Sequence, residues 1–197
     1  MRLILVRHPA PDIAPGICYG RLDVGLSPAG QAALAAMRET LAAAGIGKVV
    51  TSPARRCLVL ARALTSDPLV EPRLQELDFG AWEGLPWDAV PRDALDAWAA
   101  DPLGFAPPDG ETGAALIGRV RDAVASLLRS GGDCIVVTHG GPLRLIPALL
   151  RGDEPDLLAQ PPPIGAILHV THAIAVSPAH SAATTQAPST SPVNPPI

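Results

Sequence analysis

The chain has 197 residues, a formal net charge of −4, and a composition that is 48% hydrophobic but only 3% aromatic. This length is enough for one α/β domain with a substantial core, and the apolar content is that of a globular rather than a disordered chain. The acidic balance argues against a general nucleic-acid or membrane surface, so we expect neither as a partner.

The first predicted element is a strand, because four apolar residues, 3–6, run straight into Arg7-His8-Pro9. Short, fully apolar runs are typical of buried strands in parallel sheets. Ligands bind beyond the carboxyl ends of such strands, so we expect Arg7 and His8 at the rim of a pocket. The loop over 10–26, rich in proline and glycine, would form one wall of that pocket.

Alternating helix and strand signals follow this loop. Ser27-Pro28 and Ser52-Pro53 are both helix-start signals, with serine as N-cap and proline in the first turn. Residues 72–112 are less regular and hold all three tryptophans. We interpret them as a cap over the strand ends, with its insert at about 77–110. The predicted helices are 28–44, 53 to about 64, 111–129 and 142–150, and the predicted strands are 48–51, 69–70, 133–138 and 164–170.

This alternation predicts the fold class, which is α/β, a three-layer α/β/α sandwich with a mostly parallel central sheet. A single domain would span 1–176, and the Ser-, Thr-, Ala- and Pro-rich residues 177–197 are predicted to be disordered.

No signal peptide or membrane span is visible. The three cysteines form no C-x-x-C pair. We therefore expect a cytoplasmic protein with reduced thiols.

A second strand also ends in a histidine, within the stretch from Cys134 to Gly141. A third strand end leads into Arg55-Arg56, at a helix N-terminus that suits an anion. Each arginine alone could be a solvated surface residue. Two histidines with two or three arginines at one edge of an acidic protein instead describe a phosphate pocket.

Five motifs occur in order along the chain: Arg7-His8-Pro9, Gly20-x-x-Asp23-x-x-Leu26-Ser27-x-x-Gly30, Ser52-x-x-x-Arg56, Glu76-x-x-x-Gly80-x-Trp82-Glu83-Gly84 and His139-Gly140-Gly141. Together they resemble the histidine phosphatase superfamily, which includes cofactor-dependent phosphoglycerate mutases and α-ribazole phosphatases. The resemblance covers about residues 1–172. Cys18-Tyr19-Gly20 with Asp23 looks most like the α-ribazole phosphatase branch.

The resemblance implies a role for each matching residue. His8 would be the nucleophile and His139 the second catalytic histidine. Glu76 would be the acid, although Glu83 flanks the same turn and is also plausible. Arg7 and Arg56, rather than Arg55, would bind phosphate. We also expect Tyr19, Gly20 and Gly140 to bind substrate.

The chemistry of these side chains is consistent with those roles. A neutral imidazole can attack phosphorus and form a phosphohistidine, and Arg7 and Arg56 would help to keep His8 neutral. Glu76 could protonate the leaving alkoxide and then activate water. This scheme needs no metal and no cofactor. His169 and His172 are three residues apart on a predicted strand end, which points them to opposite faces and argues against a metal site.

The sequence therefore predicts a metal-independent phosphomonoesterase that acts on a small phosphorylated metabolite, with α-ribazole 5′-phosphate as the candidate substrate. A phosphoglycerate mutase is an alternative, but the short segment between Glu76 and His139 favours hydrolysis. A phosphohistidine-protein phosphatase and a catalytically weak phosphate-binding module also stay open. Pro9 stands where the family usually has glycine, and Ala14 stands where it often has asparagine. These two departures support the catalytically weak phosphate-binding module. The oligomeric state stays open too.

Overall fold

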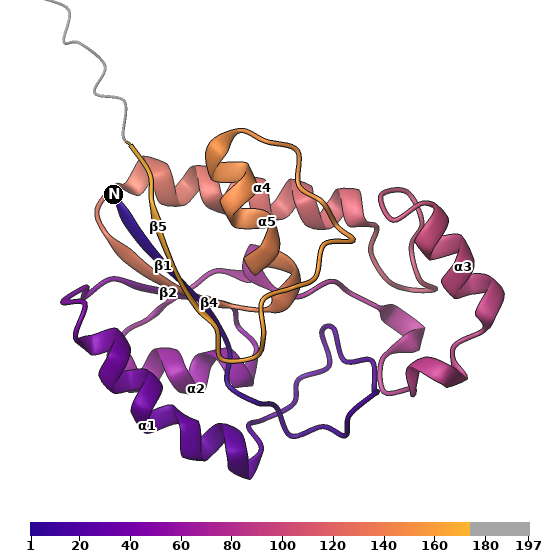
Figure 1. Ribbon diagram of the computed structural model, residues 1–197, viewed down its shortest axis with the longest axis horizontal. Helices are drawn as coiled ribbons and strands as arrows, with labels where there is room; N and C mark the ends of the chain where they lie inside the picture. Colours follow the sequence, from indigo (N-terminus) through magenta and orange to yellow (C-terminus); the bar gives the residue numbers. More distant parts are fainter. Residues whose placement is uncertain (174–197) are drawn as a thin grey trace, which may run out of the picture.

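The computed structural model describes residues 1–173, which form a five-stranded sheet with helices on both faces (Figure 1). The strands are β1 (Arg2–Arg7), β2 (Val49–Thr51), β3 (Leu69–Val70), β4 (Cys134–Thr138) and β5 (Ile167–Thr171). The helices are α1 (Pro28–Ala42), α2 (Arg55–Leu64), α3 (Arg92–Ala100), α4 (Gly113–Ser130) and α5 (Gly140–Arg151). Three 3-10 helices lie between β3 and α3: η1 (Pro72–Leu74), η2 (Gly80–Trp82) and η3 (Trp87–Ala89).

The sheet has the strand order β3-β2-β4-β1-β5, in which only β5 runs antiparallel to its neighbour. This confirms the predicted mostly parallel sheet. Arg7 at the end of β1 pairs with Thr138 at the end of β4. The residues that follow these two, His8 and His139, therefore leave the same edge of the sheet side by side.

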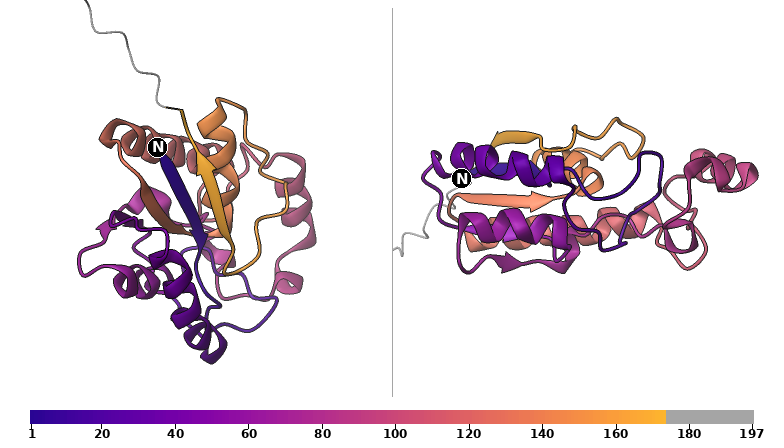
Figure 2. Two further views of the ribbon diagram at one scale, coloured as in Figure 1. Left: turned by 60° about the vertical axis from the view of Figure 1, so that its left-hand side comes forward. Right: turned by 90° about the horizontal axis from the view of Figure 1, so that it is seen from below.

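Each face of the sheet has its own apolar cluster, because alternate residues of a strand point to opposite sides. Leu3 and Leu5 of β1 pack with α4 and α5, whereas Ile4 and Val6 pack with α1 and α2. Figure 2 shows these helices as layers on either side of the strands. Burial on both faces explains why β1 reads as a continuous apolar run rather than an alternating one.

Four predicted element starts are wrong by two or three residues. α4 begins at Gly113 rather than 111, because Thr112 is its N-cap and its side chain accepts from the Ala115 amide. α2 begins at Arg55 with Ala54 as N-cap, because the Ser52 hydroxyl contacts His139 instead of capping a first turn. α5 begins at Gly140, two residues before Pro142, since His139 is extended and the helix starts directly after it. β5 begins at 167 rather than 164, because the preceding residues form a turn in which the Gly165 amide donates to the His8 carbonyl.

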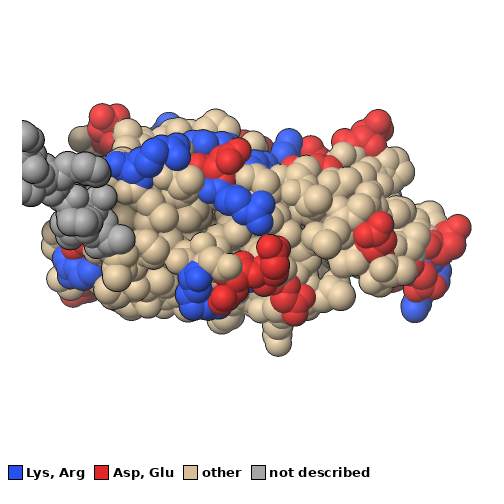
Figure 3. All heavy atoms as spheres, turned by 90° about the horizontal axis from the view of Figure 1, so that it is seen from above, with Lys and Arg blue, Asp and Glu red and all other residues tan. Residues whose placement is uncertain are grey.

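The cap region extends beyond the sheet, with α3 at the end farthest from β5 (Figures 1 and 2). In the view of Figure 3 acidic side chains lie at this end of the molecule and also in a group near its middle. No helix within residues 1–173 combines the length and hydropathy that a bilayer span requires. The predicted disordered segment, 177–197, lies outside the described residues.

Candidate active site

The two predicted histidines lie together just after the carboxyl ends of β1 and β4. Their rings are 5.2 Å apart between centroids and meet edge to face. His8 is 1% exposed and His139 is fully buried. His8 Nδ1 lies 2.8 Å from the Pro9 carbonyl oxygen. Because a carbonyl oxygen can only accept, Nδ1 carries the proton, and the lone pair of the neutral ring is on Nε2.

Burial is the main reason that His8 stays neutral. It lowers the pKa of His8 from 6.5 to about 3, with smaller contributions in the same direction from Arg56 and Arg7. The hydrogen bond to Pro9 opposes this shift in pKa. Burial also lowers the pKa of His139 well below its ordinary value, again helped by Arg56. The arginines therefore lower the pKa of His8 as expected, but burial lowers it more.

Ser52 orients the second histidine. Its Oγ is 2.7 Å from His139 Nε2. Cys57 packs on the same ring, with Sγ 3.6 Å from Nε2. Burial raises the pKa of the Cys57 thiol to about 12, so it packs there as a neutral group. The sequence placed Ser52 in a motif but misassigned its hydroxyl to the helix cap.

Arg56 is completely buried at the start of α2, whereas its neighbour Arg55 is exposed. The Arg56 guanidinium donates to the carbonyl oxygens of Gly20 at 2.8 Å and Leu22 at 2.9 Å, and it lies 5.4 Å from the centre of the Tyr19 ring. The predicted loop wall therefore holds this arginine in place. Asp23 accepts from the backbone amide of Arg55, which occupies one donor of the predicted anion-binding helix start.

Arg7 reaches across the other side of the site. Its Nη1 donates to the Pro162 carbonyl at 2.5 Å. A Cβ atom added to Gly140 would lie 3.0 Å from the Arg7 guanidinium carbon, and one added to Gly20 would collide with the Leu77 carbonyl. Gly20 is thus needed for close packing against backbone, whereas a side chain at 140 would require Arg7 to shift slightly. Both glycines line the walls of the site.

Among the described residues, three buried side-chain polar atoms have no hydrogen-bond partner: Nε of Arg7, Arg56 and Arg144. Unpaired buried N–H groups are costly, so native structures contain few of them. All three belong to arginines around one site, two of them predicted to bind phosphate. Unpaired donors on three neighbouring arginines are suited to binding an anion.

Glu76 and Glu83 have different surroundings. Each carboxylate oxygen of Glu76 lies 3.1 Å from the Gly141 amide, at the start of α5. Glu83 accepts instead from the backbone amides of Arg21, Leu22 and Phe79, so it ties the loop to the cap. Glu76 lines the pockets described below, which favours it as the acid.

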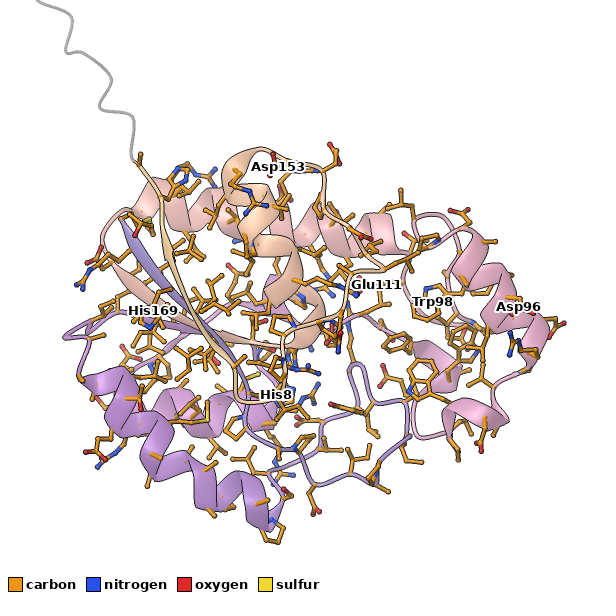
Figure 4. All side chains as sticks on the ribbon, viewed as in Figure 1. His8, Asp96, Trp98, Glu111, Asp153 and His169 are labelled. Carbon is orange, nitrogen blue, oxygen red and sulfur yellow. The ribbon has the colours of Figure 1, made fainter. Side chains whose placement is uncertain are left out.

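Two pockets meet at Gly20 and Glu76. The smaller, of about 180 Å³, also reaches Arg56 and His139. The larger, of about 310 Å³, is lined by Arg7, Ile17, Tyr19, Leu77, Phe79, Trp87, Trp98, Gly140, Gly141, Arg144 and Pro161 together with the shared residues. Figure 4 shows His8 at the end of β1 and Trp98 pointing inward from α3. Ala14, the second departure from the family pattern, lines neither pocket.

Two other arginines near the site were missed at the sequence level. Arg119 of α4 donates to the carbonyl oxygens of Arg73, Gln75 and Glu76. Arg144 of α5 lines the larger pocket. Both read as ordinary surface charges on amphipathic helices, because the segments they reach are distant in sequence. A usable signal was the spacing of four residues between Gly140 and Arg144, which places them on one helix face.

Outside this site, His169 lies on β5 opposite Ile4 and well away from His8 (Figure 4). Within residues 1–173, no group of three or more His, Cys, Asp or Glu side chains is arranged to hold a metal ion. The three cysteines are buried and unpaired.

Comparison with known proteins identifies the family. Residues 3–172 match the description of the histidine phosphatase superfamily, branch 1. The chain belongs to the histidine phosphatase superfamily. It is 35% identical over 156 residues to a bifunctional protein of Mycobacterium tuberculosis, a match that covers 74% of this chain and 43% of the relative. The chain thus spans less than half the length of that relative.

Two other members of the superfamily are matched over most of their length. A glucosyl-3-phosphoglycerate phosphatase of Mycolicibacterium vanbaalenii is 32% identical over 168 residues, covering 77% of this chain and 74% of the relative. The solved α-ribazole phosphatase of Shigella flexneri is 29% identical, with a TM-score of 0.70, covering 78% of this chain and 81% of that one. These histidine phosphatase relatives are named phosphatases, with different substrates.

Proposed function

We propose that this chain is a phosphomonoesterase that works through a phosphorylated His8. The observation that carries the proposal is the state of that ring: Nδ1 is held by the Pro9 carbonyl, which leaves the lone pair on a buried Nε2. Arg7 and Arg56 are near enough to lower the pKa of His8, and the Nε atom of each is unpaired. A neutral nucleophile flanked by cations suits attack on a phosphate ester.

In the first step the Nε2 lone pair forms a bond to phosphorus while the P–O bond to the leaving alcohol breaks. Glu76 gives its proton to the departing oxygen, so an alcohol leaves and Glu76 becomes a carboxylate. Arg7 and Arg56 neutralise the phosphoryl oxygens during transfer. In the second step water attacks phosphorus, Glu76 takes its proton, the N–P bond breaks, and phosphate leaves.

His139 would donate to a phosphoryl oxygen. If the Ser52 hydroxyl donates to Nε2 of His139, the imidazole proton is on Nδ1 and is available for this purpose. The negative charge of a bound phosphate would favour the protonated ring and offset part of its burial. Ser52 then acts as a positioning residue through His139.

The substrate would be a small phosphorylated metabolite. Similarity to relatives supports two candidates, α-ribazole 5′-phosphate and glucosyl-3-phosphoglycerate. A screen of phosphorylated metabolites for phosphate release, with and without a chelator, tests this proposal. We expect the chelator to leave the rate unchanged, and loss of activity that a divalent ion restores would contradict the metal-independent scheme.

Trapping the intermediate tests the nucleophile. Brief incubation with p-nitrophenyl phosphate that carries a labelled phosphoryl group should give a protein label that is stable in base and labile in acid. His8→Ala should abolish the label, whereas His169→Asn, on an exposed strand residue, should retain it. A label that persists in His8→Ala would overturn the assignment.

A further inference from the structure

Arg144 is a third cation at the site, without a counterion in the described structure. It lies one helical turn after Gly140 on α5 and lines the larger pocket. Its Nη1 donates to the Ala159 carbonyl at 2.8 Å, but Nε is buried without a partner. Within residues 1–173 it forms no ion pair. One edge of the guanidinium therefore lacks an acceptor.

The surroundings make this unpaired charge unfavourable. Burial lowers the pKa of Arg144 and Arg7 lowers it further, while Glu76 and Asp156 raise it. Glu76 is the carboxylate that lines the same pocket, yet its oxygens already accept from the Gly141 and Leu77 amides. A desolvated guanidinium gains most from a ligand that brings a negative charge of its own.

Arg144 lies on the leaving-group side of the site. Arg56 and His139 line the smaller pocket, whereas Arg7 and Arg144 line the larger one, so the phosphoryl group would bind where the two pockets meet. Glu76 lines both pockets, and as the predicted acid it marks the position of the oxygen that leaves. The leaving alcohol therefore extends into the larger pocket, toward Arg144.

We propose that Arg144 binds a carboxylate on the leaving alcohol, so that the preferred substrates are phosphate monoesters of hydroxy acids. This inference rests on the proposed phosphatase function and narrows its substrate class. A carboxylate matches the two parallel donors on one edge of a guanidinium. A second phosphate would need more donors than this otherwise largely apolar, aromatic pocket supplies. α-Ribazole 5′-phosphate, whose phosphate is its only anionic group, would leave Arg144 unpaired.

The pocket wall indicates what else the alcohol carries. Phe79, Trp87 and Trp98 line the space beside Arg144, and the two indole rings stack with an interplanar angle of 9°. Flat apolar rings of this kind contact the C–H face of a sugar or another ring. A hydroxy acid joined to a ring would fill both parts of the pocket.

The test compares two esters that differ in one group. 3-Phosphoglycerate has a carboxylate where glycerol 3-phosphate has a hydroxymethyl group. Wild-type protein should show the higher kcat/KM with 3-phosphoglycerate. Arg144→Ala should lower kcat/KM for 3-phosphoglycerate by about 10- to 100-fold more than for glycerol 3-phosphate, the range expected for one charged hydrogen bond. Arg144→Lys should recover part of the preference.

Arg151→Ala is the matched control, because this arginine lies on the same helix but forms an exposed ion pair with Asp153. It should retain the wild-type preference. Binding provides a second readout, since tryptophan emission of the His8→Ala protein should respond to 3-phosphoglycerate at lower concentration than to glycerol 3-phosphate. Arg144→Ala in that background should remove the difference.

Several outcomes would overturn the inference and leave the phosphatase function intact. These are equal losses for both esters in Arg144→Ala, or no wild-type preference for the acid. A larger dependence on Arg144 for fructose 1,6-bisphosphate than for 3-phosphoglycerate would assign the arginine to a second phosphate instead. Failure of the proposed function is distinct, because the protein would then hydrolyse no ester, p-nitrophenyl phosphate included.

Discussion

At the scale of single residues, Glu76 and Glu83 show how contacts distinguish two carboxylates seven positions apart. Backbone amides from two segments hold Glu83, which therefore connects the loop to the cap. Glu76 has the Gly141 amide on one side and the pockets on the other. A carboxyl group that must exchange protons with substrate needs an environment like that of Glu76, which borders the pockets.

This contrast predicts that the effect of replacing Glu76 on the phosphorylation rate depends on the leaving group. An alkoxide needs a proton as the P–O bond breaks, whereas nitrophenolate leaves readily without one. Glu76→Gln should slow phosphorylation by an alkyl phosphate by about 10²–10⁴-fold, the usual contribution of general acid catalysis, and should slow p-nitrophenyl phosphate much less. Single-turnover rates are the measurement, because slow attack by water could hide the effect in kcat.

Glu83→Gln is the control for that experiment. Its effect should come through the loop and cap, so both esters should be affected alike. If Glu83→Gln showed the leaving-group dependence and Glu76→Gln did not, the two roles would have to be exchanged.

The buried state of His8 also has a consequence for stability. The pKa of His8 is about 3 in the folded chain, against 6.5 in the unfolded one. Between these values the unfolded chain binds a proton that the folded chain does not, so stability falls as pH drops from 6.5 toward 3. His8→Asn should flatten this dependence by up to about 1.4 kcal/mol per pH unit.

Urea unfolding in phosphate-free buffer at several pH values in this window measures the slope. The exposed His169 provides the comparison, because His169→Asn should keep the wild-type slope. Identical slopes for His8→Asn and wild type would show that His8 is not held neutral by the fold.

At the scale of elements, α4 positions the segment that carries Glu76. Arg119 donates to three backbone carbonyl groups within residues 73–76 and pairs with Glu111, and Arg21 of the loop also pairs with Glu111. The Arg119 and Glu111 side chains are 16% and 14% exposed. One helix thereby fixes both the segment that carries Glu76 and the contact between loop and cap.

Arg119→Met should therefore be costly. Removing one partner of a largely buried pair typically destabilises by about 3–5 kcal/mol, because the other charge is left unpaired. Arg92→Met breaks an exposed pair with Asp96 and should cost less than about 0.5 kcal/mol. The midpoints of urea unfolding measure the loss of stability in each of the two variants. Similar small shifts for both variants would mean that the Arg119 network contributes little to the fold.

Elements also show what could be predicted from the sequence. The apolar runs of β1 and β4 identified both histidines, because a strand buried on both faces has an unmistakable composition. The start of α2 was mispredicted, since Ser52-Pro53 is a local cap signal but the Ser52 hydroxyl contacts a residue 87 positions away. Arg119 and Arg144 were missed for the same reason. Local patterns locate elements, whereas long-range packing decides what a polar side chain contacts.

At the scale of the whole molecule, the aromatic side chains are segregated. The chain has three tryptophans, two phenylalanines and one tyrosine. Tyr19 lies beneath Arg56, and the other five pack together in the cap. The cluster on the α1 and α2 face of the sheet contains only aliphatic side chains, one methionine and one cysteine. Aromatic spectroscopic signals should therefore report on the site and cap.

Two matched valines test this segregation. Val49 is 3% exposed in the α1 and α2 cluster, and Val90 is 4% exposed against Trp82. Alanine at either position should destabilise by roughly 1–3 kcal/mol. Only Val90→Ala should change the near-ultraviolet circular dichroism of the folded protein. A comparable spectral change in Val49→Ala would contradict the separation of the two regions.

The position of β1 in the sheet also matters while the protein is being made. β1 is the first strand synthesised, yet its two neighbours, β4 and β5, are the last. At roughly 5–20 residues per second, β1 leaves the ribosome many seconds before β4 exists to pair with it. During this interval its four apolar residues and the adjoining His8 have no native partner. The order of synthesis thus makes a strand whose four apolar residues are all buried the one that needs protection for longest.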